Sequence, residues 1–513
     1  MKKGFRFLIA IVIVGGIAII ALQLFSLLNG GNSDSDSISD SSLADTTPPS
    51  SQYKVDFDLN PYGKGAPSAQ YVYSGECAIE PIAPMRRGYD FAGWYLASDG
   101  SGDIWNFAED VIATPTTLYA KWTLQEYEIS FDLSGGSGAS IESQTRNYLS
   151  CDETDETDIF ALTNKVAEPS GVYTKSEFEF AGWWVGDSVD NYSQEWNFAS
   201  DLPNESMTLY AGWGNTQNNG IFSYIELANC VKITGFVGAI MPETLVIPAA
   251  FDGKPVLSIG ARAFEYASEM YAIDLPSTLT TIGERAFFSC ISLGEIDIPD
   301  TVTSIGEMAF SSCSGLYDIA LGDGLSNIGE KAFYQCTDLF NSETTSLFIP
   351  ENIIAIETDA FSIVAIDGTL YDIQFNDGLV YIGYHAFAYA YILDLFIPDS
   401  VEVIAREAFA YCHYLTRIDC GRAIRFIGYQ AFSSCNYDLY ITVVQAKPIS
   451  IKQGTFGAFP LDAHTGEPTR DLWIMVPDAE AEALYEQKEY WSQYAKNIIA
   501  FSIVGLITYP TRP

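Results

Sequence analysis

The chain has 513 residues, 48% of them hydrophobic and 14% aromatic, so it is too long for one hydrophobic core and too apolar to be disordered throughout. Its 26 basic and 66 acidic residues give a net charge of −40, which repels phosphate groups and excludes nucleic acid as a partner. Only three histidines are present, which argues against histidine-based catalysis and against a zinc site.

The N-terminal segment has the pattern of a membrane anchor. Lys2, Lys3 and Arg6 precede an uncharged run over residues 7–28, which as a helix would be about 33 Å long and could cross a bilayer. No Lys or Arg follows until Lys54, so the positive-inside rule places the N-terminus in the cytoplasm and the rest outside. We predict a cytoplasmic tip and signal-anchor helix at 1–28. The alternative is a cleaved signal peptide and a secreted protein.

Residues 29–52 are rich in Ser, Asp, Gly and Pro and have hardly any large apolar side chain. Such a segment cannot bury enough apolar surface to offset the entropy of ordering. We therefore expect a disordered tether.

Two related modules follow the tether. The first contains YKVDFDLN, GYDFAGWY and a segment ending in TLYAKW, and the second repeats them as YEISFDLS, EFEFAGWW and a segment ending in TLYAGW. Alternating apolar and polar residues predict strands in the opening and closing segments, and Trp94 and Trp183 are expected in the cores. On these segments, residues 53–123 and 127–214 resemble the Listeria-Bacteroides repeat, a small β-grasp-like module of bacterial surface proteins. The Asn- and Gly-rich segment 214–220 is expected to be a hinge.

A second, unrelated repeat fills the rest of the chain. Its signature is I-G-x-x-A-F, and the eight copies end 22–28 residues apart, at Phe264, Phe287, Phe310, Phe333, Phe361, Phe387, Phe409 and Phe432. A unit this short cannot bury its apolar face alone, so the units are expected to stack into a solenoid with one continuous core. The phrase I-x-I-P predicts a short strand whose copies form a parallel sheet, and V-T-x-I-G predicts a second turn on the opposite face, with Gly freeing the corner. The fold class is therefore mainly β.

Five cysteines fall three residues after a signature phenylalanine: Cys290, Cys313, Cys336, Cys412 and Cys435. The same position holds Ala267, Val364 and Ala390 in other units. The position thus requires a small apolar group, which predicts buried free thiols rather than a disulfide framework.

The phrases IPDTVTSIGEMAFSSCSGL and IPDSVEVIAREAFAYCHYL resemble BspA-type leucine-rich repeats, and the resemblance covers residues 221–509, including caps at both ends. In the C-terminal cap a helix is expected over 479–485, opened by Pro477 and Asp478. The resemblance implies surface display and binding of protein or host-matrix ligands, without enzymatic activity. It does not imply one ligand.

No residue pattern indicates catalysis. His385 and His413 occupy positions where other units carry unrelated residues, so His385 is interpreted as an interchangeable outer position. The loop around His464 has no specific metal-ligand spacing, and common catalytic motifs such as G-x-S-x-G are absent from the sequence. We therefore expect no enzyme, no cofactor and no metal site.

Two sets of solenoid residues are candidates for partner binding. Acidic residues recur at outward strand positions, at Asp274, Glu295, Asp297, Asp318, Asp372, Asp394 and Asp419. This stripe is either a solvated face or a docking strip for a basic partner segment or for divalent ions. Tyrosines cluster in adjacent units, at Tyr389, Tyr391, Tyr411 and Tyr414. These are either turn residues or anchors for protein or sugar contacts.

Together these features predict a membrane-anchored cell-surface adhesion or interaction protein that binds protein or matrix ligands through its solenoid. The alternatives are a structural envelope spacer without a specific partner and an enzyme that uses surface carboxylates.

Overall fold

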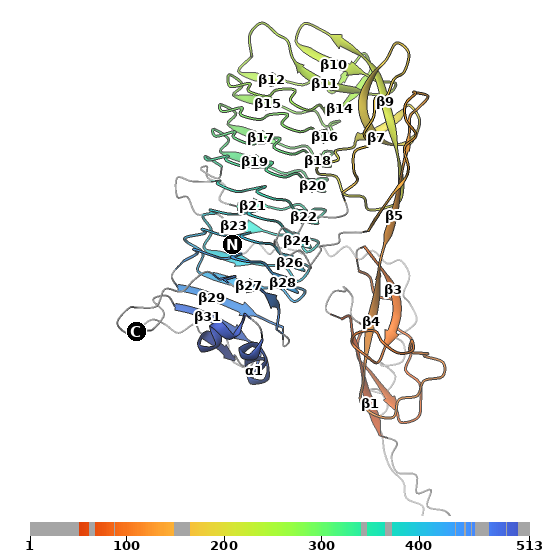
Figure 1. The fold of residues 1–513 in the computed structure, drawn as a ribbon, viewed down its shortest axis with the longest axis vertical. Helices are drawn as coiled ribbons and strands as arrows, with labels where there is room; N and C mark the ends of the chain where they lie inside the picture. The colour runs from red at the N-terminus through yellow and green to blue at the C-terminus, as the bar shows by residue number, and fades with distance from the viewer. Residues whose placement is uncertain are drawn as a thin grey trace, which may run out of the picture. The chain divides into compact units, whose positions relative to one another are not determined.

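The computed structural model describes residues 51–500, except 61–66, 87, 148–164, 340–345, 365–371, 437, 446–447, 453, 457–470 and 489. The predicted anchor helix and nearly all of the predicted tether lie outside the described residues. Within the described ranges, no helix is both long enough and apolar enough to span a membrane. The described chain consists mainly of β-strands, many of them parallel (Figure 1), which confirms the predicted fold class.

The first module is a four-stranded sheet in the order β2-β1-β4-β3. Its strands are β1 Gln52–Asp58, β2 Gln70–Tyr73, β3 Tyr89–Tyr95 and β4 Thr116–Leu124. The first and last strands are parallel, and the other pairs are antiparallel. Trp94 is only 2% exposed and lies edge-on to Phe57 and Phe91, so its predicted place in the core is confirmed.

The second module repeats this arrangement with one more strand. Its strands are β5 Glu126–Asp132, β6 Gln144–Asn147, β7 Glu179–Ser188, β8 Asn191–Glu195 and β9 Met207–Asn218. Trp183 is buried, as predicted. The hinge predicted at 214–220 is wrong for most of its length, because β9 continues through Asn218 and pairs with the next strand of the chain. Pairing along the backbone outweighs the turn preference of its Asn residues.

The N-terminal cap of the solenoid joins this module to the repeats. Its strands are β10 Phe222–Glu226, β11 Val231–Phe236, β12 Thr244–Val246, β13 Ala250–Phe251 and β14 Lys254–Ile259. Strand β10 pairs with β9 on one side and with β11 on the other, and β11 pairs in parallel with β14. Hydrogen-bonded strands therefore run without interruption from the second module into the solenoid.

Each repeat, here called a coil, contributes one short parallel strand to each of two opposite faces (Figure 1). The strands of the first face, here called the first sheet, form three successive parallel ladders: β12, β15 Ala272–Asp274, β17 Glu295–Asp297 and β19 Asp318–Ala320; then β21 Ser346–Phe348 and β23 Asp372–Gln374; then β25 Asp394–Phe396, β27 Arg417–Cys420, β29 Asp438–Val443, β31 Asp471–Val476 and β32 Ile498–Ala500. The second sheet contains β14, β16 Thr281–Ile282, β18 Ser304–Ile305, β20 Asn327–Ile328, β22 Ala355–Ile356, β24 Tyr381–Ile382, β26 Val403–Ile404, β28 Phe426–Ile427 and β30 Ser450–Ile451. The predicted pair of strands per unit is confirmed.

The core between the sheets is a stack of identical side chains. The signature phenylalanines follow one another from Phe264 to Phe432 and continue to Phe456, with ring centroids 5.0–6.0 Å apart and interplanar angles of 1–13°. The five cysteines of the repeat position are buried and unbridged. Their thiols donate to the carbonyl oxygen of a phenylalanine in the preceding coil, as Cys313 does to Phe287 at 3.1 Å. One hydrophobic cluster thus spans the coils, as predicted.

The signature glycine is selected by close approach of two backbones rather than by an unusual φ angle. A Cβ atom on Gly329 would lie 2.7 Å from the amide nitrogen of Glu307 in the preceding coil. The left-handed conformations fall instead on two non-glycine positions of each coil, such as Lys331 and Gln335 with φ of 56° and 60°. The predicted corner-freeing role of this glycine is therefore wrong. Glu357 and Ala405 replace the glycine in two coils.

The C-terminal cap closes the solenoid. Helix α1 spans Ala479–Gln487, and the side chain of Asp478 caps it by accepting from the backbone N–H of Ala481 at 2.8 Å, which confirms the predicted helix start. The short 3₁₀ helix η1, Ser492–Asn497, follows. Trp491 and Tyr494 lie against Phe456, the last ring of the stack, and so cover the end of the core.

Candidate recognition surface

The second module packs against the second sheet of the solenoid. Glu195 of β8 pairs with Lys232 and accepts from the Ser258 hydroxyl at 2.5 Å, and Thr281 donates to the backbone oxygen of Glu195. Further along the chain, Tyr381, Val403 and Phe426 of the second sheet share a buried cluster with residues of the module. The second module therefore covers much of the second sheet. The first sheet and the turns remain as candidate recognition surfaces.

A buried carboxyl group lies in this contact. Asp201 is 1% exposed and accepts from the backbone N–H of Asn197 at 2.8 Å and from the hydroxyl of Ser304. Burial raises its pKa to about 6, although its hydrogen bonds act in the opposite direction. The contact between module and solenoid therefore contains a group that titrates near neutral pH.

The predicted acidic residues lie on the outward face of the first sheet, in two columns. Glu295 and Asp318 are register partners in neighbouring strands, and Asp394 is the register partner of Arg417. Four members are exposed, Asp274, Glu295, Asp297 and Asp372, and three are half-buried, Asp318, Asp394 and Asp419. Asp419 forms an ion pair with Arg417. The acidic residues thus face outward from neighbouring strands, and at the C-terminal end of the stripe Arg417 compensates the charge of Asp419.

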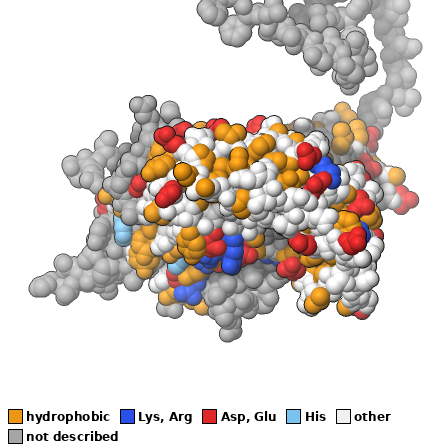
Figure 2. Space-filling model, turned by 90° about the horizontal axis from the view of Figure 1, so that it is seen from above, with side chains coloured by type: hydrophobic (Ala, Val, Ile, Leu, Met, Phe, Trp, Pro, Cys, Tyr) orange, Lys and Arg blue, Asp and Glu red, His pale blue; other side chains and the backbone are white. Residues whose placement is uncertain are grey.

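Exposed phenylalanines, which the sequence analysis did not select, lie among these acids. Phe348 is 62% exposed and Phe396 is 53% exposed, at the outward third position of β21 and β25. The Arg417 guanidinium lies 5.2 Å from the ring centroid of Phe396. Reading the third strand position in every repeat would have identified both rings. Figure 2 views the molecule from above, at right angles to Figure 1, and shows hydrophobic and acidic side chains side by side on that end.

The predicted tyrosines form two ring pairs between adjacent coils. Tyr389 and Tyr411 stack with centroids 4.7 Å apart and an interplanar angle of 9°, and they are 40% and 38% exposed. Tyr391 and Tyr414 lie 5.3 Å apart. Tyr414 is exposed, whereas Tyr391 packs against the core. Tyr389, Tyr411 and Tyr414 are therefore exposed, whereas Tyr391 is half-buried and contacts Tyr414.

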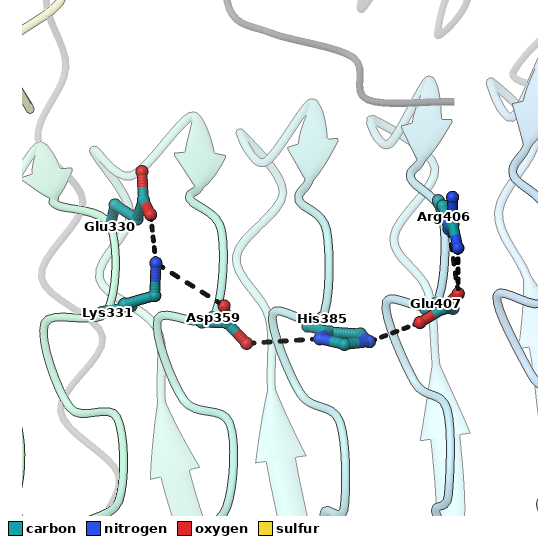
Figure 3. Close-up of polar contacts among 6 residues, drawn as sticks. All are labelled: Glu330, Lys331, Asp359, His385, Arg406 and Glu407. Atoms are coloured by element: carbon teal, nitrogen blue, oxygen red, sulfur yellow. Dashed lines mark hydrogen bonds and ion pairs between the residues drawn. The ribbon is translucent and has the colours of Figure 1, made fainter. Parts of the chain in front are cut away.

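A ladder of polar contacts crosses the turns of four coils (Figure 3). Lys331 contacts Glu330 and lies 3.9 Å from Asp359. His385 lies 3.4 Å from Asp359 through Nδ1 and 2.5 Å from Glu407 through Nε2, and Arg406 lies 2.9 Å from Glu407. His385 shares its turn position with Arg285, Lys331 and Gln430 of other coils, as the sequence indicates. Its ring also bridges carboxylates of the two neighbouring coils, which the prediction did not include. Comparing adjacent coils pairwise, rather than column by column, would have found this alternation of charge.

The described residues offer no centre for metal chemistry. No group of three or more His, Cys, Asp or Glu side chains among them has the arrangement needed to hold a metal ion. Burial raises the pKa of the Cys336 thiol to about 12, so this cysteine is a core residue and not a nucleophile.

Comparison with known proteins supports the two predicted resemblances. The family model of the BspA type leucine rich repeat region matches residues 257–366 and 339–459, and that of the Listeria-Bacteroides repeat domain matches 53–121 and 127–212. Internalin H of Listeria monocytogenes is 31% identical over 175 residues, 34% of this chain and 27% of that protein. A protein of Evansella cellulosilytica, whose name suggests a membrane protein, is 30% identical over 162 residues, 31% of this chain and 21% of that protein.

Among solved structures, a leucine rich cell surface protein from Faecalibacterium prausnitzii is 26% identical. The match covers 47% of this chain and 73% of that one, with a TM-score of 0.38. The chain thus spans 21% and 27% of the two curated relatives.

Proposed function

We propose that this chain, whose residues 257–459 match the BspA type leucine rich repeat region and whose residues 53–121 and 127–212 match the Listeria-Bacteroides repeat domain, is displayed at the cell surface and binds a protein or matrix ligand through its solenoid. The similarity to Internalin H supports this location.

Attachment to the membrane is part of the proposal. The run at 1–28 anchors the protein, the segment 29–52 gives it reach, and the chain from the first module onward faces outward. Fractionation with an antibody against the solenoid tests this: anchored protein stays with the membrane, whereas release into the medium would indicate cleavage.

The outward face of the first sheet carries the proposal. The second sheet is covered by the second module, whereas the first sheet presents exposed rings at Phe348 and Phe396 beside the acidic columns. Aromatic side chains anchor many protein interfaces.

The charge of this face favours a basic protein partner. Like charges about 5 Å apart on neighbouring strands repel by roughly 1 kcal/mol per pair in water, and a Lys or Arg of a partner would relieve such repulsion along the acidic columns. Partner cations would meet the acidic columns while apolar side chains cover the phenylalanines. The stacked pair Tyr389 and Tyr411 provides a second contact area on the adjacent turns.

The test is a binding screen of residues 52–513 against surface and matrix proteins, followed by variants. Replacing Phe348 and Phe396 with Ser, or Glu295 and Asp297 with Lys, should weaken a specific partner at least tenfold, and added salt should weaken it further. Lys substitutions at the exposed Glu205 and Asp187 of the second module change the net charge equally and serve as the control. Equal loss in the control would show that only net charge matters.

The tyrosine pair is tested in the same screen. Replacing Tyr389 and Tyr411 with Ser should reduce binding, while Tyr266→Ser, at the equivalent turn position of another coil, should not. A partner retained by every variant would remove this surface from the proposal. Failure of all partners to bind would favour the structural spacer.

A further inference from the structure

His385 connects three successive coils through both nitrogens of its ring. Nδ1 lies 3.4 Å from the Asp359 carboxylate of the preceding coil, and Nε2 lies 2.5 Å from the Glu407 carboxylate of the following coil (Figure 3). A neutral imidazole has one N–H donor, whereas an imidazolium has two. Only the protonated ring can therefore donate to both carboxylates.

The surroundings of the ring are defined by a few charged and titratable groups. On the Asp359 side lies Lys331, itself in contact with Glu330, and on the Glu407 side lies Arg406. The Tyr384 ring stacks on the imidazole at 4.0 Å. With His385 protonated, the charges at this turn position alternate in sign from Lys331 through Asp359 and His385 to Glu407. With His385 neutral, one ring nitrogen presents a lone pair to a carboxylate.

The same coils carry the exposed tyrosine pair. Tyr389 follows His385 by four residues and Tyr411 follows Glu407 by four, and all four residues adopt left-handed backbone conformations, with φ of 53–65°. Between the two contacts, the N–H of Phe387 donates to Ala408 and the N–H of Tyr389 donates to Ala410, both at 2.9 Å. The histidine contact and the tyrosine stack thus join the same two turns at their opposite ends.

We propose that protonated His385 is a pH-dependent clamp that holds the turns of adjacent coils together and thereby fixes the spacing of Tyr389 and Tyr411. This regulation rests on the proposed binding role of the tyrosine pair. The clamp is closed when the imidazolium donates to Asp359 and Glu407. It loosens when the ring loses its proton, because one of the two contacts becomes unfavourable.

The direction of the pH response follows from the environment of the ring. Burial lowers the pKa of His385, but its hydrogen bonds to the Asp359 and Glu407 carboxylates and the negative charges of these groups outweigh burial, so the pKa lies above its ordinary value of 6.5. A raised pKa in the folded state means that the contribution to stability is complete below the unfolded pKa and is lost as pH rises through the folded pKa. The clamp is therefore closed in mildly acidic solution and opens toward alkaline pH.

The experiment is an NMR titration of residues 52–513 labelled at histidine and tyrosine, which is tractable because the chain has three histidines. The His385 signal should titrate above pH 6.5, and the ring signals of Tyr389 and Tyr411 should shift with the same midpoint. In Glu407→Gln the midpoint of His385 should fall. The clamp would be overturned by a midpoint of His385 at or below 6.5, or by tyrosine signals that do not shift as His385 titrates.

A matched variant separates the clamp from folding. His385→Gln places at this turn the residue that Gln430 provides in a nearby coil, where φ is 54°, so the backbone conformation is compatible. In this variant the tyrosine signals should lose their pH response while the remaining spectrum stays folded; a retained response would also overturn the clamp. Ligand retention by Tyr389→Ser with Tyr411→Ser would remove the binding role alone, because the titration of His385 does not depend on a ligand.

Discussion

Ser304 in strand β18 of the solenoid donates a hydrogen bond to Asp201 of the second module, 103 residues earlier in the chain. The contact is buried on both sides, and the first module has no counterpart. Asp110, at the equivalent position, accepts only from the backbone N–H of Asn106 among the described contacts, at 2.7 Å. The same motif is thus used for a local turn in one module and for attachment to the solenoid in the other.

This contact predicts a pH dependence of stability. The pKa of Asp201 rises from 3.8 to about 6 on folding, because the carboxyl is buried. Its contribution is therefore present below pH 3.8 and is lost as pH rises through 6. The shift of about two units corresponds to about 3 kcal/mol at most. Urea denaturation at pH 5 and pH 7.5 should show that Asp201→Asn removes part of the loss of stability at the higher pH. The same pH difference in variant and parent would contradict the assignment.

The phenylalanine stack predicts a strong dependence on one ring. Phe333 is fully buried between Phe310 and Phe361, so Phe333→Ala should cost about 3–5 kcal/mol of unfolding free energy. Phe348→Ala, which truncates a ring that is 62% exposed, should change stability by about 0.5 kcal/mol or less. Urea denaturation measures both variants. Similar losses would mean that the stack does not carry the core.

The core could be predicted from the sequence because each coil places the same types of apolar residue at the same positions. Phe310, Cys313 and Ile305 recur at fixed spacing, and any one coil reveals the role of its neighbours' residues. His385 could not be predicted in this way, because its role depends on Asp359 and Glu407 in other coils and not on the residues at its own position. A comparison of the same position in all coils does not show such contacts between different positions.

The packing of the second module against the solenoid could also not be predicted from the sequence. Leu202 is 8% exposed, whereas its counterpart Val111 in the first module is 52% exposed, yet both are apolar residues in nearly identical segments. Only the continuation of β9 past Gly214 into a strand next to β10 distinguishes them, and the Asn-rich composition there favours a turn instead.

Continuity of β9 predicts where the chain can be divided. A fragment that begins at residue 125 keeps the second module intact, whereas one that begins at 215 cuts β9 and exposes Tyr381, Val403 and Phe426 of the second sheet. Each fully exposed apolar side chain costs roughly 1.5–3 kcal/mol. Fragment 125–513 should therefore unfold at a clearly higher urea concentration than fragment 215–513. Equal midpoints would show that the module does not support the solenoid.

The cysteines predict a simple pattern of thiol reactivity. Cys77 is half-buried, while the other seven cysteines among the described residues are buried. Burial raises the pKa of Cys230, Cys336 and Cys420 from 9.0 to about 12, which leaves about a thousandfold less thiolate at pH 8. Cys151 lies outside the described residues, so the experiment uses Cys151→Ser.

With a chromogenic disulfide reagent at pH 8, one thiol per chain should react within minutes, and the remaining seven should react only after urea unfolds the solenoid. In Cys77→Ser with Cys151→Ser the fast phase should disappear. If the parent shows several fast thiols, the coils open far more readily than a continuous packed core allows. If it shows fewer than seven slow thiols after unfolding, adjacent coils are bridged by disulfides, and the repeat position holds crosslinks rather than small apolar groups.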